Sequence, residues 1–211
     1  VPHVARPSLT LNAHGGAFRT RGAPVFVSAP LNAPSRFLAY NLYVDLTICE
    51  VPMVDTDFAW RLTQGLVRID SSDPGAYEDE IERYIKALVE ERLAQLSHPV
   101  LYAVQVEELE VMPGRRNLMV TVPGLSDEPR LVYICHMDTV TLGDGWDADT
   151  PPLGAIVRND KLYGRGACDM KGGLACAIAA LVHTLERVAA DGALPRRGFS
   201  LICSVDEEDF M

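Results

Sequence analysis

The stretch GGLACAIAALVHTLERV, residues 172–188, decides the fold of this 211-residue chain. At about 100° per residue its large apolar side chains fall within one narrow sector, as in a helix with one buried face. These residues are Leu174, Ile178, Leu181, Leu185 and Val188. His183 points almost directly away from that sector, so we expect it at the surface and not as a metal ligand. The stretch therefore predicts a long helix that begins near Gly172 and packs against a core.

Apolar, strand-like runs lie on both sides of this helix in the chain. LVYIC at residues 131–135 precedes it, and FSLICSV at residues 199–205 follows it after DGALPRRG. Short apolar runs bounded by turn residues are typical of buried strands. A strand, a helix and a strand in alternation indicate a layered α/β domain, in which helices cover a sheet.

Two more helices and two more strands are predicted upstream. Asp55 or Thr56 caps the first helix, and SSDPG at residues 71–75 ends it. The apolar face of this helix comprises Phe58, Leu62, Leu66 and Ile69. The apolar side of the second helix comprises Ile81, Ile85, Leu88 and Leu96. Its N-terminal half and outer face are loaded with acids, as the helix dipole favours: Glu78, Glu80, Glu82 and Glu90. Strands are expected at about 100–108 and at 117–122.

Residues 1–52 give no readable fold. They mix Pro, Gly, Ala and Asn with short apolar patches, and the chain begins with Val. Neither a helical nor a strand period is sustained there. Two explanations stay open for this unassigned leader: it is flexible, or it is foreign to the domain. The domain itself is expected to occupy residues 53–211.

Composition bounds the classes of partner and compartment. The chain is 48% hydrophobic and carries a net charge of −10, with no run of Lys or Arg. Nucleic acids and anionic membranes are therefore poor partners. No uninterrupted apolar stretch approaches the ~18 residues of a membrane span. The five cysteines contain no C-x-x-C pair and mostly lie in apolar runs, which indicates core residues in a reducing compartment. We expect a cytoplasmic protein.

The last residues of the sequence contain a cluster of acidic side chains. SVDEEDFM, residues 204–211, places four carboxylates directly after an apolar strand. Like charges repel at short range, and a carboxylate leaves water only at a cost unless a cation meets it. Taken alone, the cluster favours a solvated turn over a cation site, because acids are mostly exposed.

Two further polar groups follow predicted strand or turn segments. His136 and Asp138 stand where the strand LVYIC runs out, and ligands of open α/β sheets bind beyond the carboxyl ends of strands. The alternative to a ligand site is a structural role, in which His136 is a hydrogen-bonded histidine at the end of a strand and Asp138 starts a turn. LYGRGACDMKGG, residues 162–173, looks like a phosphate loop but has Asp169 where a dinucleotide motif needs Gly, and Gly after Lys171 where a P-loop needs Ser or Thr. Its glycines instead place the Asp169 carboxylate at the start of the long helix.

His136, Asp169 and Glu208 together offer nitrogen and oxygen donors of the kind that zinc and similar divalent cations prefer. Each lies at or beside the end of a strand or the start of a helix. Glu207, next to Glu208, is then a spare acid.

Four motifs in this order resemble one enzyme family. HMDTV, then Gly145-Trp146, then KLYGRGACDMKGG, then VDEE are similar to the signatures of the co-catalytic zinc metallopeptidases that include acetylornithine deacetylase, succinyl-diaminopimelate desuccinylase, aminoacylase and glutamate carboxypeptidase. The resemblance covers about residues 55–211 and concerns the N-terminal part of the family. It implies an α/β fold: a three-layer, mixed-sheet, zinc-exopeptidase-like catalytic domain, incomplete at the C-terminus. Thr141 and Asp209 stand where relatives often have Pro and Gly.

The resemblance also implies a role for each residue of the site. His136 is then a ligand of one metal, Asp169 the carboxylate that bridges both metals, and Glu208 a ligand of the second metal. Asp138 orients His136, and Glu207 is the general base. The cofactor is two divalent ions, zinc first, with cobalt and manganese as alternatives. The peptide bond between Asp169 and Met170 is implied to be cis.

The implied activity is hydrolysis of an amide or peptide bond in an N-acyl amino acid or short peptide through a metal-bridging hydroxide. The substrate is a small molecule or short peptide, and relatives form homodimers through a domain that this chain does not reach. Each metal of the family also takes one ligand from downstream of Met211. The alternative is therefore a catalytically incompetent, truncated fragment of such an enzyme.

Overall fold

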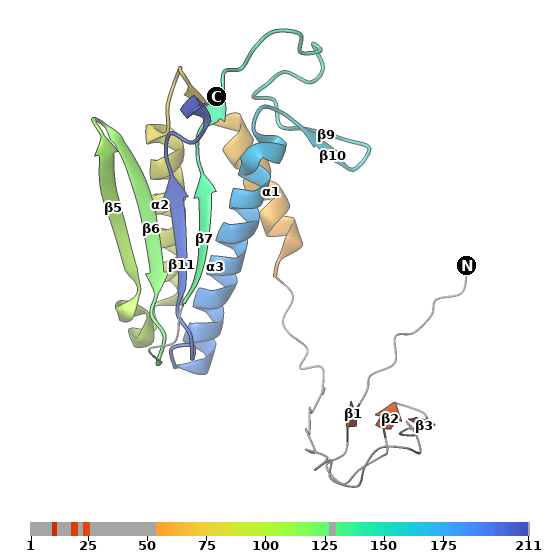
Figure 1. The fold of residues 1–211 in the computed structure, drawn as a ribbon, viewed down its shortest axis with the longest axis vertical. Coiled ribbons are helices and arrows are strands. Elements are labelled where there is room, and N and C mark those ends of the chain that lie inside the picture. Colours follow the sequence, from red (N-terminus) through yellow and green to blue (C-terminus); the bar gives the residue numbers. More distant parts are fainter. Residues whose placement is uncertain (1–9, 12–17, 21–22, 26–53, 127–129, 211) are drawn as a thin grey trace, which may run out of the picture. The chain divides into compact units, whose positions relative to one another are not determined.

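The computed structural model describes residues 10–11, 18–20, 23–25, 54–126 and 130–210 (Figure 1). The chain divides into two compact units, residues 1–53 and residues 54–211, and each is described by itself. In the first unit, β1 (Thr10–Leu11), β2 (Phe18–Thr20) and β3 (Ala23–Val25) form an antiparallel sheet in chain order. Most of the leader at residues 1–52 lies outside the described residues, so its interpretation stays a prediction.

A four-stranded mixed sheet is the centre of the second unit. Its strand order is β5-β6-β11-β7. The strands are β5 (Gln105–Met112), β6 (Arg115–Val122), β7 (Leu131–His136) and β11 (Phe199–Ser204). β6 pairs antiparallel with both β5 and β11, whereas β11 and β7 are parallel. The predicted α/β class with a mixed sheet is confirmed.

Three helices cover this sheet from one side, as Figure 1 shows: α1 (Thr56–Arg68), α2 (Asp79–Leu96) and α3 (Gly172–Asp191). All three were predicted from their periodicity. The Asp55 carboxylate caps α1 by accepting a hydrogen bond from the Phe58 amide at 2.9 Å. All five apolar residues predicted for the buried face of α3 are buried.

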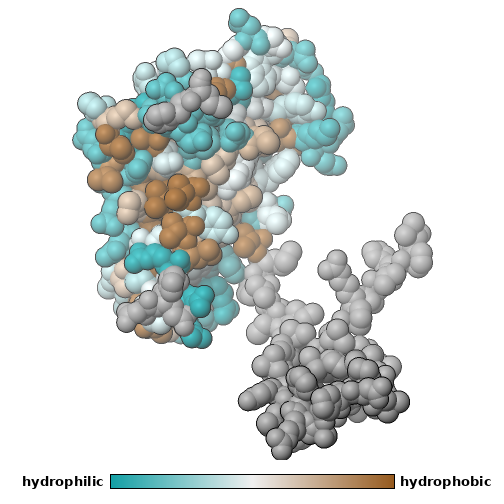
Figure 2. Space-filling view, viewed as in Figure 1, coloured by the Kyte–Doolittle hydropathy of each residue, from teal (hydrophilic) through white to brown (hydrophobic). Residues whose placement is uncertain are grey.

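The core lies between these helices and the sheet. Its strand residues include Leu118 and Val120 on β6 and Leu201 on β11, and none of them is exposed. The opposite face of the sheet carries exposed apolar side chains, which Figure 2 shows in brown: Leu109, Val111, Val132 and Ile134. The described residues thus supply two of the three layers that the family resemblance implies.

One predicted strand begins later than expected. Pro99–Ala103 forms the 3-10 helix η1, so β5 starts at Gln105 and not near residue 100. His98 caps this short helix, because its Nδ1 accepts the Val100 amide at 3.3 Å. Proline at the first helical position has a suitable φ and no N–H group that needs a partner. These local signals outweigh the strand-like composition.

Two surface predictions are wrong, and a third, for His183, holds in part. Glu78 and Glu82 of the α2 region were expected on the outer face, yet both side chains are 1% exposed. They are buried because Arg115 and Arg116 of β6 reach the start of α2 and pair with them. His183 is half-buried.

The cysteines divide between core and surface. Cys135 and Cys203 are buried as expected, whereas Cys168 and Cys176 are exposed, against expectation. Cys49 lies outside the described residues.

Short elements surround the end of the sheet. β4 (Ser72–Asp73) pairs with β8 (Thr139–Val140), and β9 (Ile156–Arg158) forms a hairpin with β10 (Lys161–Tyr163). The single helical turns η2 (Ala167–Lys171) and η3 (Glu208–Phe210) complete this end.

One helical stretch, Ala167–Asp191, is long and apolar enough to span a membrane by length and composition alone. Its apolar face belongs to the core, and a core helix of a soluble protein passes the same test.

Candidate metal centre

The site is built where two parallel strands end together. β7 and β11 run in the same direction, and His136 at the end of β7 is in register with Ser204 at the end of β11. The residues that follow each strand therefore emerge at one edge of the sheet. Asp138 follows β7, and Glu207 and Glu208 follow β11. Asp169 reaches the same place from the turn before α3.

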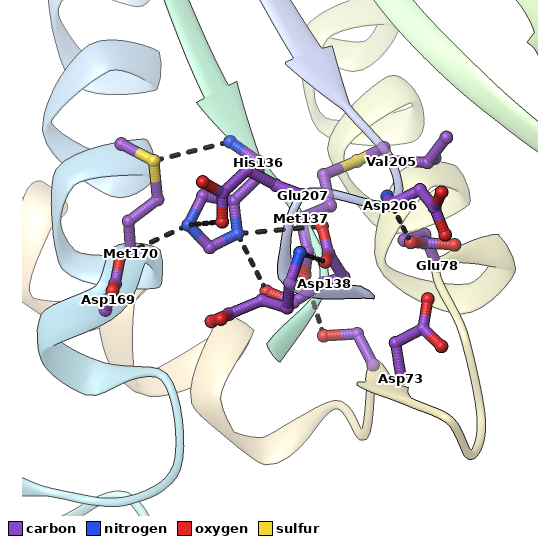
Figure 3. A network of polar contacts seen from close by, with 12 residues as sticks. Asp73, Glu78, His136, Met137, Asp138, Asp169, Met170, Val205, Asp206 and Glu207 are labelled. Atoms are coloured by element: carbon purple, nitrogen blue, oxygen red, sulfur yellow. Dashed lines mark hydrogen bonds and ion pairs between the residues drawn. The ribbon is translucent and has the colours of Figure 1, made fainter. Parts of the chain in front are cut away.

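The three residues proposed as metal ligands converge. One ligand atom each from His136, Asp169 and Glu208 lie within 4.8 Å of one another. His136 Nε2 is 3.2 Å from Asp169 Oδ1 and 3.7 Å from Glu207 Oε2. Figure 3 shows the carboxylates of Asp138, Asp169 and Glu207 gathered around the His136 ring. Segments more than 70 residues apart in the chain thus meet at one point.

Asp138 lies on the far side of the imidazole. His136 Nδ1 is 3.0 Å from the Asp138 backbone oxygen and 3.6 Å from its Oδ1. The other carboxylate oxygen, Oδ2, accepts the Glu208 amide at 2.8 Å. The Asp138 side chain is fully buried. One buried carboxylate therefore orients both His136 and Glu208, and Nε2 of the ring is left facing Asp169 and Glu207.

The electrostatics of the site favour a positive charge. Burial alone would lower the pKa of His136, but hydrogen bonds with Asp138 and Asp169 outweigh it and raise this pKa to about 9. Burial also raises the pKa of Glu208, and the negative charges of Asp169 and Glu207 add to the shift. Carboxylates this crowded lose their repulsion when a cation lies among them. The donor set and its charge thus fit a divalent ion.

The site is buried on one side and open on the other. His136 and Glu208 are 6% and 8% exposed. The side chains of Asp169 and Glu207 are 78% and 59% exposed. A substrate therefore has access from the side of these two carboxylates.

The turn that carries Asp169 is fixed by its neighbours. Gly166 has φ 75°, and a Cβ there would lie 2.6 Å from the Thr139 side chain, so only glycine fits. The buried Lys171 donates from Nζ to the Ile69 backbone oxygen at 2.7 Å. The His136 amide donates to Met170 Sδ at 3.3 Å. The Asp169–Met170 peptide bond is cis, as the resemblance implied.

A second acidic group lies beside the first and was not predicted from the sequence. Oxygens of Asp73, Glu78 and Asp138 lie within 4.8 Å of one another, and all three residues are buried. Arg115 pairs with Asp73, Glu78 and Asp206. The pair Arg115-Arg116 after a Pro-Gly turn was the available signal, but nothing in the sequence showed which acids it meets.

Part of the chain matches a known family. Residues 132–210 match the family model described as Peptidase family M20/M25/M40. The chain is 42% identical over 80 residues to succinyl-diaminopimelate desuccinylase of Gluconobacter oxydans (strain 621H), which covers 38% of this chain and 19% of that relative. It is 43% identical over 81 residues to the Rhodopseudomonas palustris (strain TIE-1) protein of the same name, which covers 38% and 20%. The chain thus spans about a fifth of the length of these curated relatives.

Two solved structures share the fold. The M20 family metallo-carboxypeptidase Sso-CP2 from Sulfolobus solfataricus aligns with a TM-score of 0.53 and 23% identity over 72% of this chain and 31% of that chain. Human carnosine dipeptidase 1 aligns with a TM-score of 0.52 and 20% identity over 70% and 31%. At these identities the likeness concerns the fold alone. Together with the family match and the converging motifs, it shows that residues 132–210 are similar to peptidase family M20 and that the second unit shares the fold of its solved members.

Proposed function

We propose that this site serves the metal-dependent hydrolysis of an amide or peptide bond in an N-acyl amino acid or short peptide. The observation that carries the proposal is the convergence of His136, Asp169 and Glu208 ligand atoms within 4.8 Å, with the Glu207 carboxylate alongside. The sequence similarity to two succinyl-diaminopimelate desuccinylases supports this proposal.

Two divalent cations fit the donors. His136 would hold one ion, Glu208 the other, and Asp169 both. Imidazole and carboxylate donors suit zinc first, with cobalt and manganese as alternatives. When bound, such a pair supplies Lewis-acid polarisation of the scissile carbonyl and lowers the pKa of water.

Glu207 is the proposed general base. Its carboxylate is exposed and its Oε2 lies 3.7 Å from His136 Nε2, so it borders the ligand cluster on the open side. From there it takes a proton from the attacking water and delivers it to the leaving amine. Asp138 contributes by holding Nδ1 of His136, which fixes the ring and raises its basicity toward a metal.

The desuccinylase similarity makes an N-succinyl amino acid the first substrate to test, ahead of N-acetyl amino acids and dipeptides. We expect amine release by the longest natural polypeptide that contains these residues, loss of this release in a chelator, and recovery on adding zinc. Glu207→Gln is expected to bind zinc as the parent does and to lose at least about 100-fold in kcat, the usual contribution of a general base.

The same assay on the 211-residue chain decides the alternative of an incompetent fragment. Zinc binding without amine release would support that alternative for this chain. Amine release that survives the Glu207→Gln change, or that needs no metal, would contradict the proposed mechanism.

A further inference from the structure

We propose that Arg115 is a positioning residue that holds Glu207 in place through Asp206. The proposal rests on the proposed function, because it assigns Glu207 the role of general base. Arg115 lies on β6, far from Glu207 in the sequence. Within the described part of the chain its guanidinium pairs with Asp73, Glu78 and Asp206, and none of these is a proposed metal ligand.

The guanidinium is shared among three buried or half-buried acids. Nη2 donates to Asp73 Oδ2 at 2.6 Å, Nε donates to Glu78 Oε2 at 2.7 Å, and Nη1 donates to Asp206 Oδ1 at 2.7 Å. The side chain of Arg115 is 12% exposed, and those of Asp73, Glu78 and Asp206 are 5%, 1% and 18% exposed. Arginine suits this place because its planar group offers donors in several fixed directions and stays charged.

Asp206 is held at both its side chain and its backbone. Its carboxylate accepts from Arg115, and its amide donates to Glu78 Oε1 at 3.1 Å. Its φ is 62°, in the left-handed region that a non-glycine residue rarely adopts. The Arg115 and Glu78 contacts therefore stabilise a backbone turn that would otherwise relax. This turn determines where the next residue, Glu207, points.

Glu208 has an anchor of its own. Its amide donates to Asp138 Oδ2 at 2.8 Å, and Asp138 is held by His136. Glu207 thus lies between two anchored residues, one tied to the Arg115 cluster and one tied to the metal-ligand cluster. Loss of Arg115 should release the Asp206 side of the turn and spare the Glu208 side.

The Arg115 cluster is better explained as a positioning device than as another metal site. Asp73, Glu78 and Asp138 crowd together, but the guanidinium already donates to two of them. Hydrogen bonding to Glu78 raises the pKa of Arg115, so its charge is permanent. The protein's own cation therefore occupies the place that a metal would take. The guanidinium of Arg115 also lies over the Tyr77 ring, with its Cζ 4.6 Å from the ring centroid.

Arg116 provides a matched control. It is the next residue on β6, and it also bridges acids, namely Asp79 at 2.8 Å, Glu82 at 3.2 Å and Glu108 at 3.3 Å. These partners belong to α2 and β5, and none belongs to the turn at residues 205–208. Arg115→Met and Arg116→Met therefore remove similar ion-pair networks from the same strand.

Amide hydrogen exchange tests the proposal without any catalysis. By NMR on the zinc-loaded 211-residue chain, the Asp206 amide of Arg115→Met should exchange at least about 10-fold faster than in the parent, and the Glu208 amide should change less than about 3-fold. In Arg116→Met both amides should match the parent.

Kinetics on the hydrolytically active polypeptide provide the second readout. Arg115→Met should lower kcat by roughly 10- to 100-fold with KM and bound zinc nearly unchanged, because a small displacement of a catalytic group has effects of that size. Arg115→Lys keeps the positive charge but lacks the planar guanidinium with its several donors. We expect its kcat to lie between those of Arg115→Met and the parent. If Arg115→Met fails to fold, Asp206→Asn replaces it and should lower kcat in the same direction.

Equal kcat in the Arg115 and Arg116 variants, or an Asp206 amide that stays protected in Arg115→Met, would overturn the proposal. A parent protein that hydrolyses none of the substrates would instead contradict the proposed function, and the exchange result would still decide whether Arg115 holds the turn.

Discussion

At the scale of single residues, Asp138 connects more of the site than any ligand does. It is fully buried, faces Nδ1 of His136, and accepts the Glu208 amide through Oδ2. Burial opposes its ionisation, but the hydrogen bonds from His136 and Glu208 keep its pKa below the ordinary value. A permanent negative charge is thus fixed behind the imidazole, where it favours a cation on Nε2.

Asp138→Asn should weaken zinc binding by about 10- to 100-fold, the usual cost of losing a partner behind a metal-bound histidine. Asp144→Asn is the control, because Asp144 is an exposed acid on the loop that follows. Competition with a chromophoric chelator measures both affinities. Equal zinc affinity in Asp138→Asn and the parent would show that this carboxylate does not support the site.

At the scale of elements, α3 contributes most to the core and begins beside the site. Nine of its residues are buried, and its first turn follows the one that carries Asp169. Shortening a buried side chain of α3 should therefore lower the stability of the whole unit, because the cavity it leaves lies in the core that α3 shares with α1 and the sheet.

Ile178→Ala should lower the free energy of unfolding by about 2–5 kcal/mol, because Ile178 is fully buried. Ile134→Ala makes the same chemical change at a side chain that is 65% exposed. We expect Ile134→Ala to lower the free energy of unfolding by less than about 1 kcal/mol, which is the range of intrinsic strand propensities. Urea denaturation followed by circular dichroism compares the two. A loss in Ile178→Ala no larger than in Ile134→Ala would contradict the placement of α3.

The elements that the sequence predicted correctly are those with local signals. The period of α3, the Asp55 cap of α1 and the apolar run of β11 each lie within a few residues. The errors depend on distant partners. Glu78 was predicted on the outer face of its helix, but it is buried against Arg115, which lies 37 positions later in the chain. Only the docking of the β5–β6 hairpin on α2 brings these two residues together, and no local pattern in the sequence indicates that docking.

The candidate site divides in the same way. Its five residues were proposed from the sequence, because each lies within a short motif that follows a strand or precedes a helix, and their roles stay a prediction. The Asp73, Glu78 and Arg115 contacts behind it were not predicted, since no spacing in the sequence indicates which buried acids share one guanidinium.

At the scale of the whole molecule, one face of the sheet is covered by helices and the other carries exposed apolar side chains (Figure 2). The site lies at the end of this sheet where the parallel strands stop, so the fold presents its carboxylates at an edge and not inside the core. Relatives are about five times longer than the matched segment. The complete activity is accordingly a proposal for the whole protein, whereas cation binding by the converging residues can be tested on this chain.

The most direct test is therefore X-ray diffraction from zinc-soaked crystals of this chain, recorded on both sides of the zinc absorption edge. We expect anomalous density beside His136 Nε2 and the carboxylates of Asp169 and Glu208, at about 2.0–2.2 Å from the donor atoms. No such density should appear at Asp73 and Glu78, where Arg115 already provides the positive charge. Zinc bound only elsewhere, with no density beside His136, Asp169 and Glu208 at saturating zinc, would show that these residues do not form a metal site.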